Sequence, residues 1–159
     1  MIKKHPFAPV IHKDCRILIL GSLPSVRSVQ EGFYYMHPQN RFWKLMSAIY
    51  EFDFVTADIS QKKEALLSFG IALYDVVAQC SIEASKDSTI QNAAVQDIRG
   101  LLRNTSIEKI VLNGKTAYSL FLKAYPGLTD MAVYAPSTSS ANASYSLEKL
   151  TAVWRKILI

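Results

Sequence analysis

Two stretches of this chain carry the side chains best suited to chemistry. The first is Gly-Ser-Leu-Pro-Ser at 21–25, continued by Gly-Phe-Tyr-Tyr-Met-His-Pro-Gln-Asn-Arg-Phe-Trp at 32–43. The second is the Pro-braced turn Ala-Pro-Ser-Thr-Ser-Ser-Ala-Asn at 135–142. Aromatic rings stack on nucleobases, and small hydroxyl side chains let backbone amides approach a phosphate closely. Taken singly, each stretch is equally consistent with a cap on the core or with an ordinary serine-rich loop.

Several common kinds of site are excluded by spacing. Gly114-Lys115-Thr116 resembles the end of a phosphate-binding loop, but the position that needs the earlier glycine is Lys109. The histidines have no metal-ligand spacing, and Cys15 and Cys80 cannot form a zinc or iron–sulfur site by themselves. There is no dinucleotide fingerprint, no Gly-x-Ser-x-Gly elbow and no evident pair of catalytic carboxylates. We therefore expect neither a metal nor a cofactor.

The elements that must position the two stretches follow from the hydrophobic pattern. Continuous apolar runs predict buried strands, and apolar residues at helical spacing predict helices. Strands are expected at 16–20, 71–77, 109–113 and 131–134, and helices at 42–50, 60–69, 93–103, 114–125 and 146–157. Asn40 stands where it would cap the first of these helices, and residues 1–14 read as an irregular arm.

This alternation predicts an α/β fold, a three-layer α/β/α sandwich around a central, mostly parallel four-stranded sheet, in a single domain over residues 1–159. Loops that follow parallel strands lie along one edge of the sheet. The connections 21–39, 80–92, 113–114 and 135–144 should therefore converge. Acidic residues in or next to them are few, namely Glu31, Asp75, Glu83 and Asp87.

Composition narrows the class of partner. The formal net charge of +5 and pI near 9.2 favour a polyanion, although the excess is mild. No apolar run reaches the length of about 18 residues that a membrane span needs, so no membrane association is expected. The first residues lack a signal-peptide pattern, and two cysteines cannot make a disulfide framework. A reducing, cytoplasmic location is expected.

Taken together, the motifs resemble the uracil-DNA glycosylase superfamily, and most closely its hypoxanthine (deoxyinosine) DNA glycosylase branch. The pattern is Gly-Ser-x-Pro-Ser at 21–25, His-Pro-x-Asn-Arg-Phe-Trp at 37–43 and Pro-Ser-Thr-Ser at 136–139, with further similarity at 112–117 and around Asp87-Ser88. The resemblance implies a monofunctional DNA glycosylase that hydrolyses the N-glycosidic bond of a flipped, deaminated base and leaves an abasic site. It implies hypoxanthine as the base, with uracil and xanthine as further candidates, DNA containing deaminated bases as the partner, and a monomer.

The resemblance also implies roles for individual residues. Asn40 would be the catalytic amide, which has no useful pKa and so would either position water or hydrogen-bond the base. Tyr35 would stack on the extruded base, and Asn113 would contact the base edge. The remaining pocket wall would come from Gly21, Ser22, Leu23, Pro24 and Ser25, and the DNA contacts from Pro136, Ser137, Thr138, Ser139 and Ser140.

The chain departs from its relatives at Leu23. Mismatch-specific members have an asparagine there, and a leucine cannot orient or activate water, which argues against strong uracil excision. Ala135 and Ser140 replace the bulkier and proline residues often found around the second motif, so the stiffness of that turn is expected to differ. The alternative that these departures favour is a non-catalytic nucleic-acid or nucleotide-binding protein on the same fold.

Overall fold

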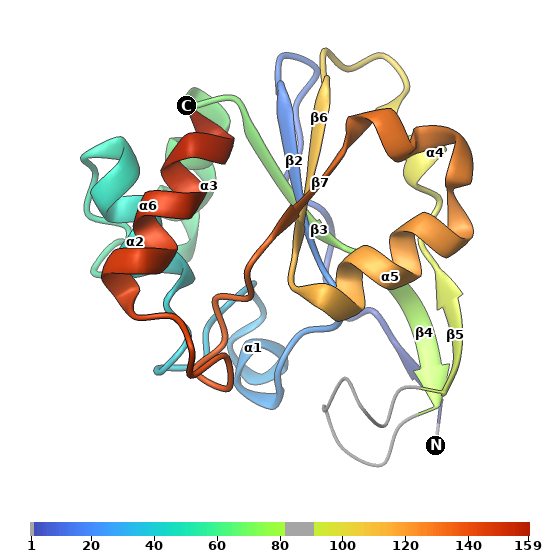
Figure 1. Ribbon diagram of the computed structural model, residues 1–159, viewed down its shortest axis with the longest axis horizontal. Helices are drawn as coiled ribbons and strands as arrows, with labels where there is room; N and C mark the ends of the chain where they lie inside the picture. Colours follow the sequence, from blue (N-terminus) through green and yellow to red (C-terminus); the bar gives the residue numbers. More distant parts are fainter. Residues whose placement is uncertain (1, 82–90) are drawn as a thin grey trace.

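A four-stranded parallel sheet forms the centre of the fold (Figure 1). The computed structural model describes residues 2–81 and 91–159. In spatial order the strands are β3 (Ile71–Asp75), β2 (Ile17–Gly21), β6 (Lys109–Asn113) and β7 (Ala132–Ala135). Every neighbouring pair of this sheet runs parallel, which confirms the predicted central sheet.

Helices cover both faces of the sheet and complete the predicted three-layer sandwich. On one side lie α2 (Phe42–Tyr50), α3 (Ile59–Ser68) and α6 (Leu147–Leu158), and on the other α4 (Ile98–Leu102) and α5 (Lys115–Ala124) (Figure 1). Each helix lies within a few residues of a predicted one, apart from α4. The apolar spacing that predicted them is the stripe that each helix turns toward the sheet.

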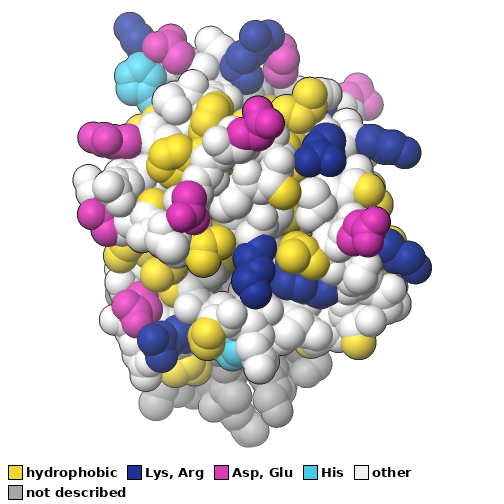
Figure 2. Space-filling model, turned by 90° about the vertical axis from the view of Figure 1, so that its left-hand side faces the viewer, with side chains coloured by type: hydrophobic (Ala, Val, Ile, Leu, Met, Phe, Trp, Pro, Cys, Tyr) yellow, Lys and Arg dark blue, Asp and Glu magenta, His cyan; other side chains and the backbone are white. Residues whose placement is uncertain are grey.

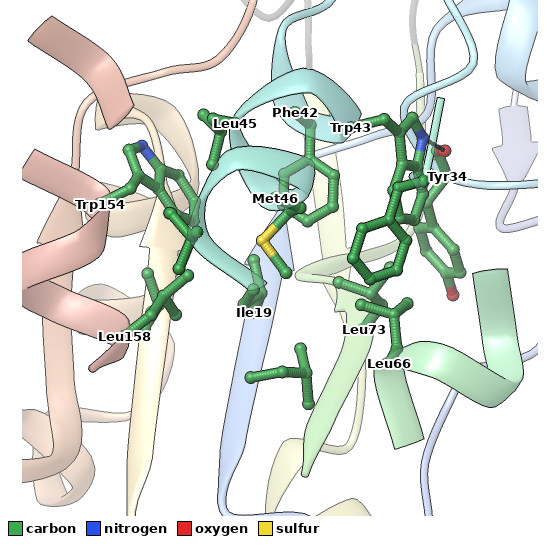
Figure 3. Packing of buried hydrophobic residues seen from close by; sticks show 14 of the residues in the cluster. Ile19, Tyr34, Phe42, Trp43, Leu45, Met46, Leu66, Leu73, Trp154 and Leu158 are labelled. Carbon is green, nitrogen blue, oxygen red and sulfur yellow. Dashed lines mark hydrogen bonds between the residues drawn. The ribbon is translucent and has the colours of Figure 1, made fainter. Parts of the chain in front are cut away.

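Two hydrophobic cores follow from this layering. Successive residues of a strand point to opposite faces of a sheet. Ile19 therefore packs with Phe42 and Trp154 in the first core, which Figure 3 shows between the sheet and α2, α3 and α6. Leu18 and Leu20 belong to the second core, on the α5 side. All five of these side chains are fully buried, so β2 is fixed from both faces, and with it the start of the first motif at Gly21.

The connections that leave the carboxyl ends of the strands gather at one edge, at the bottom of Figure 1. The first of them contains a short helix that the sequence pattern did not predict, α1 (Val26–Glu31). The Ser25 hydroxyl accepts a hydrogen bond from the Ser28 N–H at 3.1 Å, and Gly32 ends the helix with a φ of 75°. This folded connection returns Phe33 and Tyr34 to the core, where both are buried.

A second sheet was not predicted and corrects two expectations. It is antiparallel and consists of β1 (Ile2–Lys4), β4 (Val77–Ser81) and β5 (Gln91–Val95). The arm 1–14 is therefore partly regular, and the helix predicted over 93–103 begins only at Ile98, because its first residues belong to β5. Pairing of β5 with β4 satisfies its backbone groups, and Asp97 then caps a shorter helix, α4, by accepting from the Gly100 N–H. Of the predicted loop 80–92, residues 82–90, with Glu83, Asp87 and Ser88, lie outside the described residues.

Other boundaries differ by smaller amounts. The strand expected over 71–77 divides after Asp75, because β4 leaves the central sheet for the second one. The last strand begins one residue late, after a 3₁₀ helix at Pro126–Met131. Gly70 has a φ of 75°, as expected for a glycine that closes α3.

Figure 2 shows the side of the molecule that carries α2, α3 and α6. Lys and Arg side chains alternate there with Asp and Glu, so this side does not form one continuous basic surface. Among the helices of the described residues, none has the length and apolarity required to cross a bilayer.

Candidate active site

A pocket of about 540 Å³ lies at the carboxyl ends of β2, β3 and β6. It brings together most of the residues predicted for the site, namely Gly21, Ser22, Leu23, Pro24, Ser25, Tyr35, Asn40, Asn113, Ser137, Thr138 and Ser139. Its wall also contains Ser28, Tyr34, Asp75 and Ala141, which were not predicted as site residues. Pro136 and Ser140 do not line it. The two motif stretches, about a hundred residues apart in the chain, thus form one cavity.

Asn40 lies in this pocket with a defined orientation of its side-chain amide. Its Oδ1 accepts hydrogen bonds from the Phe42 N–H at 2.9 Å and from the Thr138 hydroxyl at 2.8 Å. A backbone N–H is only a donor, so the atom facing Phe42 must be the amide oxygen. The helix cap itself is Arg41, so the prediction of Asn40 as cap is one residue off. Both lone pairs of Oδ1 are occupied, and Nδ2 has no hydrogen-bond partner among the described residues.

Thr138 links Asn40 to Asn113. The Asn113 Nδ2 donates to the Thr138 hydroxyl at 3.1 Å, and the Thr138 N–H donates to the Asn113 Oδ1 at 3.1 Å. The single hydroxyl proton of Thr138 is then available only for Asn40. The order Asn113, Thr138, Asn40 is therefore a directional hydrogen-bond chain that fixes the Asn40 amide in the pocket wall and leaves its NH₂ group available to a ligand.

Burial revises the expected DNA contacts. Thr138 is 1% exposed, and Pro136 is also buried, with its carbonyl accepting from the Trp154 indole N–H at 3.0 Å. Neither is accessible for the DNA contact that the sequence led us to expect. Ser137 and Ser139 are half-buried and Ser140 is exposed. Any DNA contact of this turn therefore falls to the three serines, for which it stays a prediction.

Arg41 is a structural residue of the site that sequence reasoning missed. Its guanidinium donates to the carbonyls of Ser139 at 2.7 Å, of Asn142 at 3.1 Å and of Tyr145, and its backbone N–H donates to the Thr138 carbonyl at 3.0 Å. Only its place next to Asn40 in the first motif could have drawn attention to it. Arg41 ties the second motif turn to the start of α2, and so holds Thr138 against Asn40.

Replacing Arg41 by lysine is expected to destabilise the protein by about 1–3 kcal/mol, because an ammonium cannot satisfy several divergent carbonyls as a planar guanidinium does. Thermal unfolding and limited proteolysis between residues 136 and 146 measure the effect. Arg155→Lys is the matched control, since Arg155 donates one exposed hydrogen bond, to the Ala48 carbonyl. Equal changes in the two variants would contradict a special role for Arg41.

Tyr35 forms part of the pocket wall in a strained backbone conformation, with a φ of 56°. One face of its ring stacks on Phe42, with centroids 4.2 Å apart. Its hydroxyl is buried and makes no hydrogen bond of ordinary geometry to the described residues. Burial, and then the nearby Asp75 carboxylate, raises the pKa of Tyr35 well above its usual value, so the hydroxyl stays protonated. Stacking of its ring on a base remains a prediction.

Only glycine fits at position 21, because two side chains lie close to its backbone. A Cβ atom at this position would lie 2.6 Å from Oδ1 of Asp75 and 3.0 Å from the Tyr35 hydroxyl. Because backbone and side chains meet here without intervening atoms, the carboxylate and the phenol are neighbours at the inner end of the pocket. Sequence reasoning noted Asp75 only as an acid near the loops.

Asp75 is itself held by the N-terminal arm. Nε2 of His5 lies 2.8 Å from Oδ2 of Asp75, and both side chains are 3% exposed. The sequence predicted His5 to be a surface or structural histidine and not a metal ligand. Within the described part of the chain, no three His, Cys, Asp or Glu side chains are grouped so that they could hold a metal ion.

Comparison with known proteins agrees with this geometry. Residues 8–158 match the family model described as "Uracil DNA glycosylase superfamily". A protein named hypoxanthine DNA glycosylase from Methanosarcina acetivorans is 33% identical over 146 residues, which cover 90% of each chain. A protein of the same name from Methanosarcina barkeri is 36% identical over 126 residues, 77% of this chain and 80% of the relative. The solution NMR structure of a candidate uracil DNA glycosylase from M. acetivorans superposes with a TM-score of 0.81 at 32% identity, over 99% of both chains.

Proposed function

The chain belongs to the uracil DNA glycosylase superfamily, and from that membership we propose that it is a monofunctional DNA glycosylase that excises hypoxanthine from deoxyinosine in DNA. The proposal rests on one observation above all, the hydrogen-bond chain that presents the NH₂ group of Asn40 to the pocket. The names of the relatives at 33% and 36% identity support the choice of base. The products are the free base and an abasic site.

The base must leave the helix before it can reach Asn40. The pocket lies at the carboxyl ends of the strands, and a base inside a duplex cannot enter it without rotating out of the stack. A deaminated base pairs poorly, so it costs less to extrude than a normal one. Ser137 and Ser139 line the pocket, the exposed Ser140 follows them in the same turn, and their hydroxyls suit a phosphate backbone.

Cleavage leaves the electron pair of the glycosidic bond on the departing purine, while the oxygen of a water bonds to C1′ and one proton of that water ends on the purine. An N–H donor aimed at the purine stabilises the negative charge that develops on it. Asn40 has this donor in place, whereas its oxygen is already occupied by Phe42 and Thr138. Of the two roles that the sequence left open, hydrogen bonding to the base is therefore favoured over positioning the water.

The residue at position 23 agrees with a mechanism based on the Asn40 donor. Leu23 is half-buried in the pocket wall and provides no acceptor for an attacking water. Strong uracil excision through a residue at this position is accordingly not expected. The pocket is complete within one chain, and Cys15 is a buried free thiol, so we propose that the protein acts as a monomer in a reducing cytoplasm.

The proposal is tested with duplexes that carry deoxyinosine, deoxyxanthosine or deoxyuridine, treated with excess enzyme and then with alkali to reveal abasic sites. The fastest cleavage is expected for deoxyinosine, and none for the matching duplex with deoxyadenosine. Absence of abasic product from every lesion, together with retained binding to DNA, would instead favour the non-catalytic binder.

A further inference from the structure

The His5 side chain is packed among aromatic rings and has an oxygen atom next to each ring nitrogen. Its imidazole is enclosed by the rings of Phe7 and Tyr74, with centroids 4.9 Å away in each case, and of Tyr34 at 6.0 Å. Its Nδ1 lies 2.8 Å from the Phe7 carbonyl oxygen, and its Nε2 lies 2.8 Å from Oδ2 of Asp75. Both ring nitrogens of a nearly inaccessible histidine therefore face oxygen atoms.

These contacts fix where the protons are. A carbonyl oxygen only accepts, so Nδ1 carries a proton and donates to Phe7. The contact between Nε2 and Oδ2 also needs one proton, whether it belongs to the imidazole or to the carboxyl group. In either case this proton lies between His5 and Oδ2. The second carboxyl oxygen, Oδ1, then carries no proton and can only accept hydrogen bonds.

Oδ1 is the carboxylate oxygen beside Gly21 and Tyr35, which both line the pocket. It lies beside Gly21, where any side chain would collide with it, and the Tyr35 hydroxyl lies beside it in turn. A carboxylate oxygen has more than one acceptor position, so it can receive a base in addition to the contacts that Asp75 already makes. The inner end of the pocket thus combines an obligate acceptor with a protonated phenol.

We propose that His5 is a positioning residue that keeps Asp75 an obligate hydrogen-bond acceptor, and that this acceptor selects bases with a ring N–H next to a carbonyl. Hypoxanthine, xanthine and uracil all have this edge, whereas adenine and cytosine have an unprotonated ring nitrogen beside an amino group. Asp75 would accept from the ring N–H, and the Tyr35 hydroxyl would donate to the carbonyl. This inference rests on the proposed function, and it makes the N-terminal arm part of the site.

Guanine has the same ring N–H, so Asp75 would not reject it. Its stable pairing with cytosine keeps it in the stack, and selection against guanine lies in the cost of extrusion rather than at Asp75. The discrimination that the His5–Asp75 pair provides is between a deaminated base and the amino base from which it arose.

The test uses two duplexes, one with deoxyinosine and one with a deoxyinosine analogue whose ring N–H next to the carbonyl is replaced by C–H. Asp75→Asn is expected to lower single-turnover cleavage of deoxyinosine by at least about tenfold, the range for losing a hydrogen bond to a charged group. On the analogue, which has no N–H to give, the variant and the wild type should cleave within about twofold of each other.

His5 is tested by the same comparison of cleavage rates on the two duplexes. His5→Leu removes the partner that keeps a proton at Oδ2, so a proton on the buried carboxyl group can then occupy either oxygen, and the loss should again be confined to deoxyinosine. His5→Gln keeps an N–H for Oδ2 and should retain cleavage within a few-fold. His12→Gln is the matched control, because His12 is an exposed histidine of the same arm. Thermal unfolding of each variant establishes that it is folded under the assay conditions.

Equal losses on the two duplexes, or a His5→Gln variant as impaired as His5→Leu, would overturn the inference and leave His5 a structural residue only. A wild-type protein that cleaves no deoxyinosine would overturn the proposed function and this inference with it. Cleavage of deoxyinosine by the wild-type protein distinguishes the two failures.

Discussion

Asn40→Ala is expected to lower the single-turnover rate of deoxyinosine cleavage by about 10²- to 10³-fold, the cost of removing one preorganised donor from a developing charge. The variant removes the NH₂ group that the Thr138 and Phe42 hydrogen bonds aim into the pocket. Binding to undamaged duplex should change little, because Asn40 lies inside the pocket and not on the exposed part of the turn.

Asn40→Asp separates the two roles that an amide could have. An aspartate keeps an oxygen for Phe42 and Thr138 but replaces the donor by a second acceptor. If Asn40 acts as a donor to the base, this variant should be as inactive as Asn40→Ala. Activity retained or raised in Asn40→Asp would instead mean that the residue positions water, and the donor mechanism would be wrong.

Thr138→Val should have the second largest effect, a loss of about 10²-fold in the same assay, although the side chain is nearly isosteric and almost fully buried. Valine interrupts the hydrogen-bond chain from Asn113 to Asn40 and leaves a buried amide oxygen with one partner fewer. The Asn40 amide is then held by the Phe42 N–H alone, so its NH₂ group is directed less firmly. The rate of cleavage should fall while the concentration of enzyme that gives half-maximal rate stays within a few-fold.

Thr138→Ser distinguishes the hydroxyl from packing, since serine keeps the hydrogen bonds and loses only the methyl group. It should restore cleavage to within about tenfold of wild type. Thr129→Val serves as the control, because the Thr129 hydroxyl donates to the Pro126 carbonyl in an exposed helix away from the pocket. A Thr138→Ser variant as impaired as Thr138→Val would show that shape, and not the hydrogen-bond chain, is what matters at this position.

Hydrogen bonds of Asn40 and Arg41 join the two motifs into one site. Asn40 and Arg41 are consecutive, yet Asn40 is bonded to the Thr138 side chain and Arg41 to the carbonyls that follow it. The first residue carries out the proposed chemistry, and the second holds the loop that orients it. A change in the second motif turn therefore alters the first motif without touching the base.

The sequence by itself determined the central architecture. The short apolar runs at 16–20 and 109–113 predict strands covered on both faces, and the helical spacing after Phe42 predicts a helix with one apolar stripe against them. Because parallel strands end at one edge, the convergence of the two motif stretches also follows from the sequence pattern. The local sequence pattern is enough to predict these elements, because each one buries apolar residues that recur at the period of its own secondary structure.

Only the tertiary structure decided the second sheet and the inner geometry of the pocket. Gln91–Val95 has no apolar alternation that marks it as a strand, and its conformation depends on β4, its partner in the sheet. The direction of the Asn40 amide, the burial of Thr138 and the contact of His5 with Asp75 likewise depend on partners about 70 to 100 residues away. Hydrogen bonds between side chains over such separations leave no periodic trace in a sequence, because each is set by the packing of whole elements and not by neighbouring residues.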